Sequence, residues 1–465
     1  MKKRLIALLL AVTLIATMFV MTACGNNPET VAQGVDETNH VIKVGNTAAT
    51  TGIFAGVGIP FNYAMEAYFW YFSEHTDGYS DAAGNKYTID FVHYDDEFDA
   101  TKGTTFTEKL VEDDKVFALV GHFGSNTVAA TVDYIEEQNI PMVYGVCGVN
   151  QLYGTEGNVM TIQPIYKTEG RSMLATAFAT TEGGLGLGAT KVGVIATTDE
   201  AGASIKAGIV IEQEELGKVT DTDIFYQDVD ASASDYTAAV TAIKNAGCEV
   251  VIIASNQGPF VNIANAFTTV AYDNVDILTS YVSANYATMS GLLVSGALTA
   301  TREIYAGAWL VTGTAPSATK GWADFEKYVE VMTLYAKHNN ETLLTSSDAT
   351  YGAYVTLWFG DKDWAADGIS AYFLNSYAMA GYVAANAFCQ GLARMSGELL
   401  TWTAFIDAME EAPIDVPMGT SVNFADGQRI GIDSLAVNKY TVANYAVGEV
   451  YRTITGLATI EAGCN

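Results

Sequence analysis

The residues best placed to do chemistry lie in the segment VGHFGSNTVAA, residues 120–130. Its serine, Ser125, could act as a nucleophile, cap a helix or bind a ligand. A nucleophile needs a base, and His122 is the nearest candidate. However, the Gly-x-Ser-x-Gly elbow of serine hydrolases does not occur in the chain, and a structural role is commoner for such a histidine. We therefore expect Ser125 to cap a helix or contact a ligand, and we expect no catalytic residue.

The sequence around Ser125 predicts a strand followed by a helix. Residues 116–120 form an apolar run typical of a buried strand, and 128–138 have helical spacing. In parallel α/β sheets, ligands gather where the carboxyl ends of strands meet the starts of helices. The free N–H groups of a first helical turn favour anions. Ser125 and Asn126 are therefore candidate ligand contacts, and Ser125 can cap the helix as well.

Metal and cofactor chemistry is not indicated. The five histidines are scattered, and the cysteines form no Cys-x-x-Cys pair. Residues 184–189 (GLGLGA) match a loose dinucleotide fingerprint, but they precede the strand expected at 191–197 instead of following one. We expect no metal and no cofactor. The cysteines expected to be buried free thiols are Cys147, Cys248, Cys389 and Cys464.

The charge balance narrows the range of partners. The chain has 23 Lys and Arg against 53 Asp and Glu, a formal net charge of −30. Nucleic-acid binding needs a basic footprint, so the composition argues against that class. Electrostatic binding to anionic lipid is disfavoured for the same reason. At 465 residues the chain is long for one domain, and two lobes are expected.

The first residues indicate export. Residues 1–4 are basic, 5–21 are apolar, and small residues precede Cys24, a pattern typical of a secretory signal. The cysteine at this place resembles that of a bacterial lipobox, which implies lipidation of Cys24 and anchoring on the extracytoplasmic face of the cell membrane. We expect a lipoprotein signal peptide over 1–23 and a flexible tether over 24–39. A transmembrane anchor is the alternative, at the short end of the spanning range.

The elements that must position these residues alternate between strand and helix. Such alternation predicts a parallel sheet covered on both faces, and the pattern restarts once, which predicts a second sheet. The predicted strands are 41–44, 88–94, 116–120 and 142–146, then 191–197, 249–254 and 276–281. Residues 316–409 are expected to be mainly helical, and the end of the chain, from about 419, to form strands.

Four segments carry a family resemblance. They are VIKVGN with TGIF (41–46 and 51–54), YDD with Asp99 (94–96), KLVEDDKV leading into VGHFGS (109–116 and 120–125), and DYTAAVTAIK (235–244). In their order and spacing they resemble the Leu/Ile/Val-binding family of ABC importer substrate-binding lipoproteins. The resemblance implies the type 1 periplasmic binding protein fold, an α/β fold of two Rossmann-like lobes joined by three crossovers around a ligand cleft. Lobe I would comprise 40–163 and 313–417, and lobe II 164–312 and 418–465.

The resemblance also implies a function. Such proteins capture a small ligand by lobe closure and deliver it to an ABC permease. We therefore expect a monomeric, lipid-anchored binding protein without enzymatic activity. Its ligand would be a small polar molecule: an amino acid, an amide or a small aromatic acid. Two alternatives stay open, a surface sensor that binds without transport and an extracellular hydrolase that uses Ser125.

The family's motifs place site residues on this sequence one by one. Ser125 matches the serine that binds the carboxylate of an amino acid, and Val146 matches the residue whose backbone carbonyl takes the ammonium group. Gly148 and Asn256 stand where relatives have a threonine and a tyrosine that contact the ligand. The carboxylate contact is therefore matched, whereas the contacts for the rest of an amino acid are altered.

The family's acidic partner for the ammonium group has no match here. It should fall near Tyr281 or Val282, where the sequence has no acid, and Asp199 is the nearest substitute. Phe54, Tyr144 and Tyr281 are expected to enclose the ligand, with core packing as the alternative, and Cys147 is expected to be a small core or cleft residue. The complete expected ligand site is Phe54, Ser125, Asn126, Val146, Cys147, Gly148, Asp199, Asn256 and Tyr281.

Overall fold

The computed structural model describes residues 30–152, 157–181, 186–310, 319–446, 448–462 and 464. The expected signal peptide and the lipidation site Cys24 lie outside these residues. The last part of the expected tether is described, and it already belongs to the folded body. The N–H of Ala32 donates to the carbonyl of Leu400, and Val35–Asp36 (β1) pairs with β2 in antiparallel fashion.

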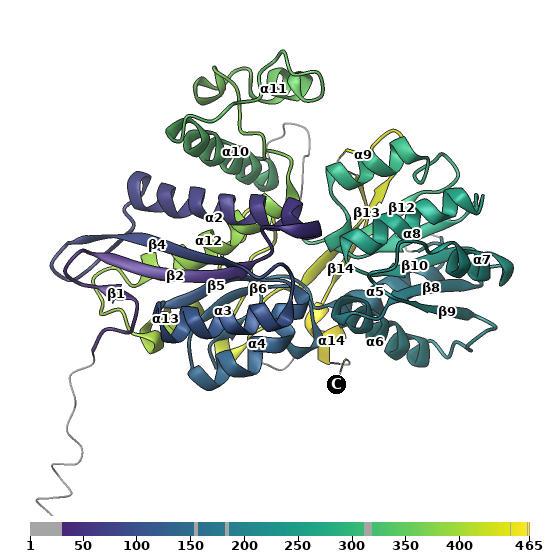
Figure 1. Ribbon diagram of the computed structural model, residues 1–465, viewed down its shortest axis with the longest axis horizontal. Helices are drawn as coiled ribbons and strands as arrows, with labels where there is room; N and C mark the ends of the chain where they lie inside the picture. Colours follow the sequence, from purple (N-terminus) through teal and green to yellow (C-terminus); the bar gives the residue numbers. More distant parts are fainter. Residues whose placement is uncertain are drawn as a thin grey trace, which may run out of the picture.

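The first lobe is built on a mostly parallel sheet (Figure 1). Its strands run in the order β3-β4-β2-β5-β6-β7, with β1 added on β2. Strands β4, β2, β5, β6 and β7 are parallel. The bounds are β2 Val41–Ala48, β3 Tyr79–Ser80, β4 Lys86–Asp95, β5 Ala118–Phe123, β6 Met142–Val146 and β7 Val159–Met160. Every residue of β5 is buried, as its apolar run predicts.

Helices cover both faces of this sheet. On one face α2 (Ala55–His75) packs along α12 (Ser376–Arg394), and on the other α3 (Ala100–Glu112) packs against α4 (Ser125–Gln138). Asp99 begins α3 because its carboxylate accepts two N–H groups of the first turn.

The second lobe contains a second mixed sheet in the order β14-β13-β12-β11-β10-β8-β9. Strands β8 to β12 are parallel, whereas β13 and β14 are antiparallel additions. Their bounds are β8 Val192–Thr197, β9 Ile224–Val229, β10 Val250–Ala254, β11 Asp276–Thr279, β12 Ile304–Ala308, β13 Ser434–Tyr440 and β14 Glu449–Thr455. The helices around this sheet are α5 Tyr166–Phe178, α6 Glu200–Glu215, α7 Thr237–Asn245, α8 Gln257–Thr269, α9 Tyr286–Ser295 and α14 Leu457–Ala462.

The order of the elements makes the chain pass between the lobes three times. It first passes from β7 to α5, which brings residues 161–165 to the junction. It returns between β12 and α10, where residues 311–318 lie outside the described part, and passes again between α13 (Trp402–Glu410) and β13. The first and third passages lie side by side, because Thr161 and Ile430 form a β-bridge. The ligand cleft expected at this junction therefore has walls from both sheets.

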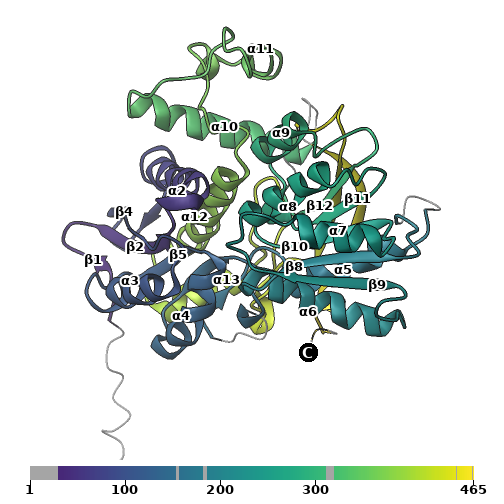
Figure 2. The ribbon, with the colours of Figure 1, turned by 45° about the vertical axis from the view of Figure 1, so that its right-hand side comes forward.

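The helical region between β12 and α12 adds a layer to the first lobe. Helix α10 (Lys320–His338) lies on the outer side of α2, and α11 (Gly352–Phe359) lies beyond it in both ribbon views (Figures 1 and 2). The core of this helical layer is aromatic, with Trp322, Phe325 and Phe359 packed together. Among the described helices, none combines the length and apolar character needed to cross a membrane.

Candidate functional site

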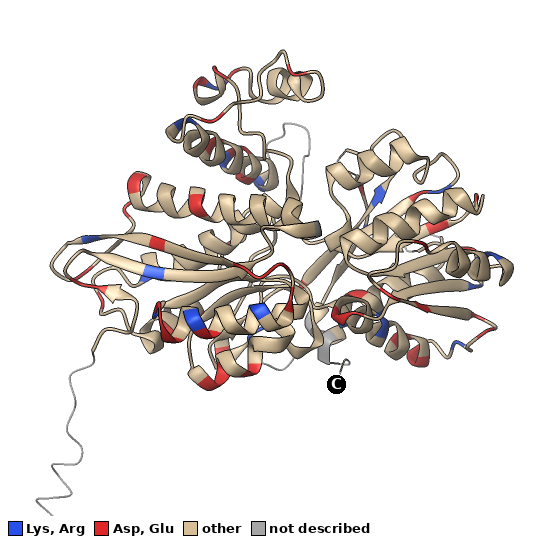
Figure 3. Ribbon diagram, in the orientation of Figure 1, with Lys and Arg blue, Asp and Glu red and all other residues tan. Residues whose placement is uncertain are grey.

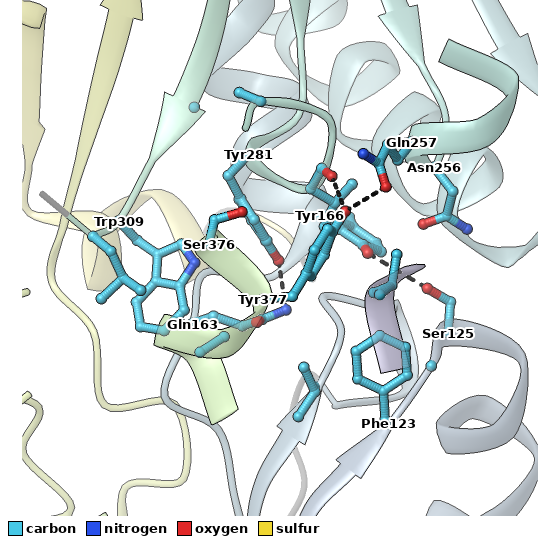
Figure 4. Close-up of a pocket in the computed structure, with 18 of the residues that line it drawn as sticks. Phe123, Ser125, Gln163, Tyr166, Asn256, Gln257, Tyr281, Trp309, Ser376 and Tyr377 are labelled. Atoms are coloured by element: carbon cyan, nitrogen blue, oxygen red, sulfur yellow. Dashed lines mark hydrogen bonds between the residues drawn. The ribbon is translucent and has the colours of Figure 1, made fainter. Parts of the chain in front are cut away.

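A cavity of about 880 Å³, its open mouth included, lies where the two lobes meet. First-lobe residues from β5, β6, α2, α4 and α12 form one side, and second-lobe residues from α8, β12 and the segment after β11 form the other (Figure 4). The aromatic side chains that line it are Phe54, Phe98, Phe123, Tyr144, Tyr166, Tyr281, Trp309, Tyr377 and Tyr440. The polar ones are Ser125, Gln163, Asn256, Gln257 and Ser376.

Ser125 is the first residue of α4 and lies in the cavity wall. The turn before it needs Gly124, whose φ of 104° is a conformation that side chains rarely adopt. The helix begins after Gly124 without a side-chain cap, so the prediction that Ser125 caps α4 is wrong. The Ser125 hydroxyl, 2% exposed as a residue, lies 3.4 Å from the hydroxyl of Tyr166 across the cleft. Because this contact is long and Ser125 lines the cavity, the hydroxyl can also bind a ligand there.

His122 does not serve Ser125 as a base. Its Nε2 contacts the hydroxyls of Thr107 and Thr131 at 3.3 and 3.1 Å, on the α3 and α4 side of the sheet. Burial lowers the pKa of His122 to about 4, so the imidazole is neutral at physiological pH. The structural role expected for this histidine is thus supported by its contacts.

A chain of hydrogen bonds forms the floor of the cavity. The Tyr144 hydroxyl donates to Gln163 Oε1 at 2.5 Å, and Gln163 Nε2 donates to the Tyr281 hydroxyl at 2.7 Å. The Tyr281 hydroxyl in turn donates to the carbonyl of Pro164 at 2.9 Å. Tyr166 stacks on Tyr281 with ring centroids 6.0 Å apart. The floor therefore joins β6 of the first lobe to the segment after β11 through the first crossover.

The described part of the cavity lining is electrically neutral. Each described side chain that lines it is aromatic, aliphatic or an uncharged polar group. Burial raises the pKa of Tyr144, Tyr166 and Tyr281 well above the ordinary value, so these phenols keep their protons. Asp and Glu residues are instead spread over the outer helices and strands of both lobes (Figure 3).

The carboxyl group of Glu169 lies directly behind this wall, and no motif in the sequence predicted it. Glu169, on α5, is fully buried and accepts hydrogen bonds from the Ser280 hydroxyl at 2.6 Å and the Tyr281 N–H at 2.7 Å. Burial raises its pKa to about 8, despite these two donors. Glu169 is therefore largely protonated at neutral pH, and it supports Tyr281 from outside the cavity lining.

Five of the nine expected site residues lie in the cavity wall, and four do not. Those in the wall come from the starts of α4 and α8 and from segments beside strand ends, where parallel sheets gather ligand groups. They are Phe54, Ser125, Val146, Asn256 and Tyr281. The residues that the structure does not bring to the wall are Asn126, Cys147, Gly148 and Asp199.

Other contacts, burial or a lack of space explain why these four residues do not line the cavity. The Asp199 carboxylate accepts from the Gly202 N–H and caps α6. At Gly148 an added Cβ would lie 2.7 Å from the Tyr166 nitrogen, so no side chain fits there. Cys147 is buried, and burial raises its pKa to about 12. Asn126 turns its amide toward the Phe98 carbonyl at 3.4 Å.

Gln163, Tyr166, Gln257 and Tyr377 line the cavity without having been predicted. Gln163 and Tyr166 flank the first crossover, whereas Tyr377 comes from α12 and contacts Gln257 120 positions away in sequence. The expected boundary between the lobes, at residues 163 and 164, was the one sequence signal for Gln163. The described residues contain no cluster of three or more metal-ligating side chains.

Comparison with known proteins gives the same architecture. The family model described as "Periplasmic binding protein" matches residues 41–333. No curated protein shows a significant sequence match to the chain.

Three solved structures illustrate the likeness in fold. A fatty acid ABC transporter substrate-binding protein from Thermomonospora curvata has 16% identity, covers 93% of this chain and 97% of its own, and gives a TM-score of 0.66. A leucine binding protein from Thermotoga maritima has 14% identity, coverages of 89% and 99%, and a TM-score of 0.65. An ABC transporter solute binding protein from Rhodopseudomonas palustris, in complex with p-hydroxybenzoic acid, has 16% identity, coverages of 90% and 97%, and a TM-score of 0.65.

Proposed function

Because the chain belongs to the periplasmic binding protein family, we propose that it is an extracytoplasmic solute-binding protein that closes its lobes on a small carboxylate with an aromatic or apolar body. It would deliver this ligand to an ABC permease, acting as a monomer without enzymatic activity. The lipobox-like sequence around Cys24 supports a lipid anchor on the membrane.

The observation that carries this proposal is the combination of a neutral aromatic cavity with the start of α4 in its wall. The rings and aliphatic side chains suit an apolar body, which gains free energy by leaving water. The Ser125 hydroxyl, at the first turn of α4, suits a carboxylate, because free N–H groups and the helix dipole favour negative charge there.

An amino acid suits this cavity less well than a simple carboxylate. A buried ammonium group needs a counter-charge or several acceptors, and the described lining supplies no acidic side chain. Asp199, the substitute expected from the sequence, is engaged at the start of α6. The p-hydroxybenzoic acid bound by the Rhodopseudomonas palustris protein is an aromatic carboxylate of the proposed kind.

A thermal-shift panel on the mature chain tests the proposal. The ligands would be 3-phenylpropanoate, 4-hydroxybenzoate, octanoate, L-leucine, benzamide and glucose at equal concentrations. A ligand that binds only the folded state raises the melting temperature by mass action. We expect the aromatic carboxylates to give the largest shifts. Stabilisation by glucose alone, or by L-leucine far above the carboxylates, would contradict the proposed ligand class.

A further inference from the structure

Tyr377 links the two lobes inside the cavity. It is the second residue of α12 in the first lobe, and its ring lines the cavity. Its hydroxyl lies 2.7 Å from the carbonyl oxygen of Val282 and 3.0 Å from Gln257 Oε1, both in the second lobe (Figure 4). Burial raises the pKa of Tyr377, so its hydroxyl keeps the proton that it shares between these two acceptors.

Gln257 is held at both ends by these contacts. Its Oε1 faces the Tyr377 hydroxyl, and its Nε2 donates to the Thr288 hydroxyl at 2.6 Å. The side chain therefore cannot rotate to offer its oxygen elsewhere without losing both bonds. Tyr377 in this way engages two of the acceptors in the second-lobe wall.

The acceptors that remain do not suit an ammonium group. Gln163 Oε1 is engaged by Tyr144, and the Val146 carbonyl is approached by the Gly124 N–H at 3.4 Å. Asn256 donates its Nδ2 to Asp199, which leaves its own Oδ1 as a free acceptor. An ammonium group carries three donors and a full positive charge. The oxygens that remain, among them Asn256 Oδ1 and the hydroxyls of Ser125 and Ser376, are uncharged and supply no counter-charge for it.

We infer that Tyr377 is a specificity-determining residue, which withdraws the Val282 carbonyl and Gln257 Oε1 from the ligand and thereby excludes molecules that carry an ammonium group. This inference rests on the proposed carboxylate-binding function and deepens it. The choice between ligands then depends on which oxygens in the cavity wall are free to accept hydrogen bonds from the ligand. Without the Tyr377 hydroxyl, both oxygens face the space that the hydroxyl leaves, where an ammonium group would find two acceptors.

The matched ligands 3-phenylpropanoate and L-phenylalanine test this inference, because they differ only in the α-ammonium group. Their dissociation constants would be measured by calorimetry at pH 7 for the wild type, Tyr377→Phe and Tyr382→Phe. Tyr382 lies on the same helix, is buried and does not line the cavity, so its variant controls for the loss of a buried tyrosine hydroxyl. We expect Tyr377→Phe to reduce the preference for 3-phenylpropanoate about tenfold, the effect of one hydrogen bond to a charged group.

The ratio of the two dissociation constants separates a role of Tyr377 in specificity from a role in lobe closure. If Tyr377 only held the lobes together, Tyr377→Phe would weaken both ligands equally and leave the ratio unchanged, which overturns the inference and leaves the proposed function standing. A wild type that binds neither ligand, or prefers L-phenylalanine, overturns the proposed function and the inference with it.

A second variant covers the case in which Tyr377→Phe does not fold. Gln257→Glu has nearly the same shape, and its carboxylate can still accept from Tyr377 and from the Thr288 hydroxyl. It places a negative charge at the acceptor that we assign. We expect the relative affinity for L-phenylalanine to rise at least tenfold, since ion-paired hydrogen bonds are stronger than neutral ones. An unchanged ratio in Gln257→Glu would show that this part of the wall does not select against ammonium.

Discussion

The Glu169 carboxyl group and the backbone N–H of Tyr281 form a 2.7 Å hydrogen bond behind the cavity wall. The other end of Tyr281 is fixed as well, because its hydroxyl accepts from Gln163 and donates to the Pro164 carbonyl. Glu169 and the first crossover thus hold one aromatic residue at its backbone and at its phenol. The wall that meets the ligand is therefore positioned before the ligand arrives, which lowers the cost of binding.

Glu169→Gln should change how stability depends on pH. Burial raises the pKa of Glu169 from 4.5 to about 8 in the folded protein, so the folded state keeps a proton that the unfolded state releases. Its contribution is fully present below about pH 4.5 and is lost as the pH rises to about 8. Urea midpoints from pH 4.5 to 9 should show the wild type losing stability relative to Glu169→Gln. Parallel profiles would contradict this assignment.

Gly307→Ala should displace the Glu169 carboxyl group that holds the backbone of Tyr281. A Cβ at Gly307 would lie 2.3 Å from Glu169 Oε1, and the Glu169 side chain is fully buried and held by two hydrogen bonds. We expect a loss of about 1–3 kcal/mol in the free energy of unfolding, the usual cost of overpacking. Gly291→Ala is the control, because nothing lies within 4 Å of its added Cβ on α9. Equal melting temperatures for the two variants would argue against tight packing at Gly307.

Ser125→Ala should weaken carboxylate binding without unfolding the protein. The Ser125 hydroxyl has one long contact, 3.4 Å to Tyr166, so its loss costs the fold little. Losing a hydrogen bond to a charged ligand should lower the affinity for 3-phenylpropanoate about tenfold. The exposed Ser347→Ala serves as control. If benzamide, which has no charge, lost as much affinity as the carboxylate, the anion role of Ser125 would be refuted.

Asp199→Ala should reduce stability and leave ligand preference unchanged. The Asp199 carboxylate accepts from the Gly202 N–H and the Thr197 hydroxyl at the start of α6. Losing such a cap costs about 1 kcal/mol, which denaturant unfolding would measure. A selective loss of L-phenylalanine binding would instead show that Asp199 acts as the counter-charge of an ammonium group.

Much of the fold could be predicted from the sequence, because each buried strand corresponds to a short run of apolar residues. The run at 116–120 became β5, and EVVIIA became β10 at Val250–Ala254. Site residues that follow directly on such strands could be predicted too. Ser125 follows β5 and Asn256 follows β10, and both reach the cavity.

The remaining site residues depend on contacts that no local pattern encodes. Tyr377 meets Gln257 and Val282 only because α12 returns to the first lobe and the lobes then meet. Glu169 lies in an ordinary helical sequence, and the packing of α5 against α6 and the second-lobe sheet brings it to the Tyr281 N–H. The prediction that Ser125 caps α4 is wrong because Gly124, with its positive φ, takes the cap position and Ser125 becomes the first helical residue.

The central claim is that a neutral cavity binds a carboxylate and rejects an ammonium group. Calorimetric titration of the wild type with 3-phenylpropanoate and L-phenylalanine at pH 7 tests it most directly. The structure predicts that 3-phenylpropanoate binds at least about tenfold more tightly, because the ammonium group would lose its water without gaining a counter-charge. Equal or tighter binding of L-phenylalanine would contradict the claim.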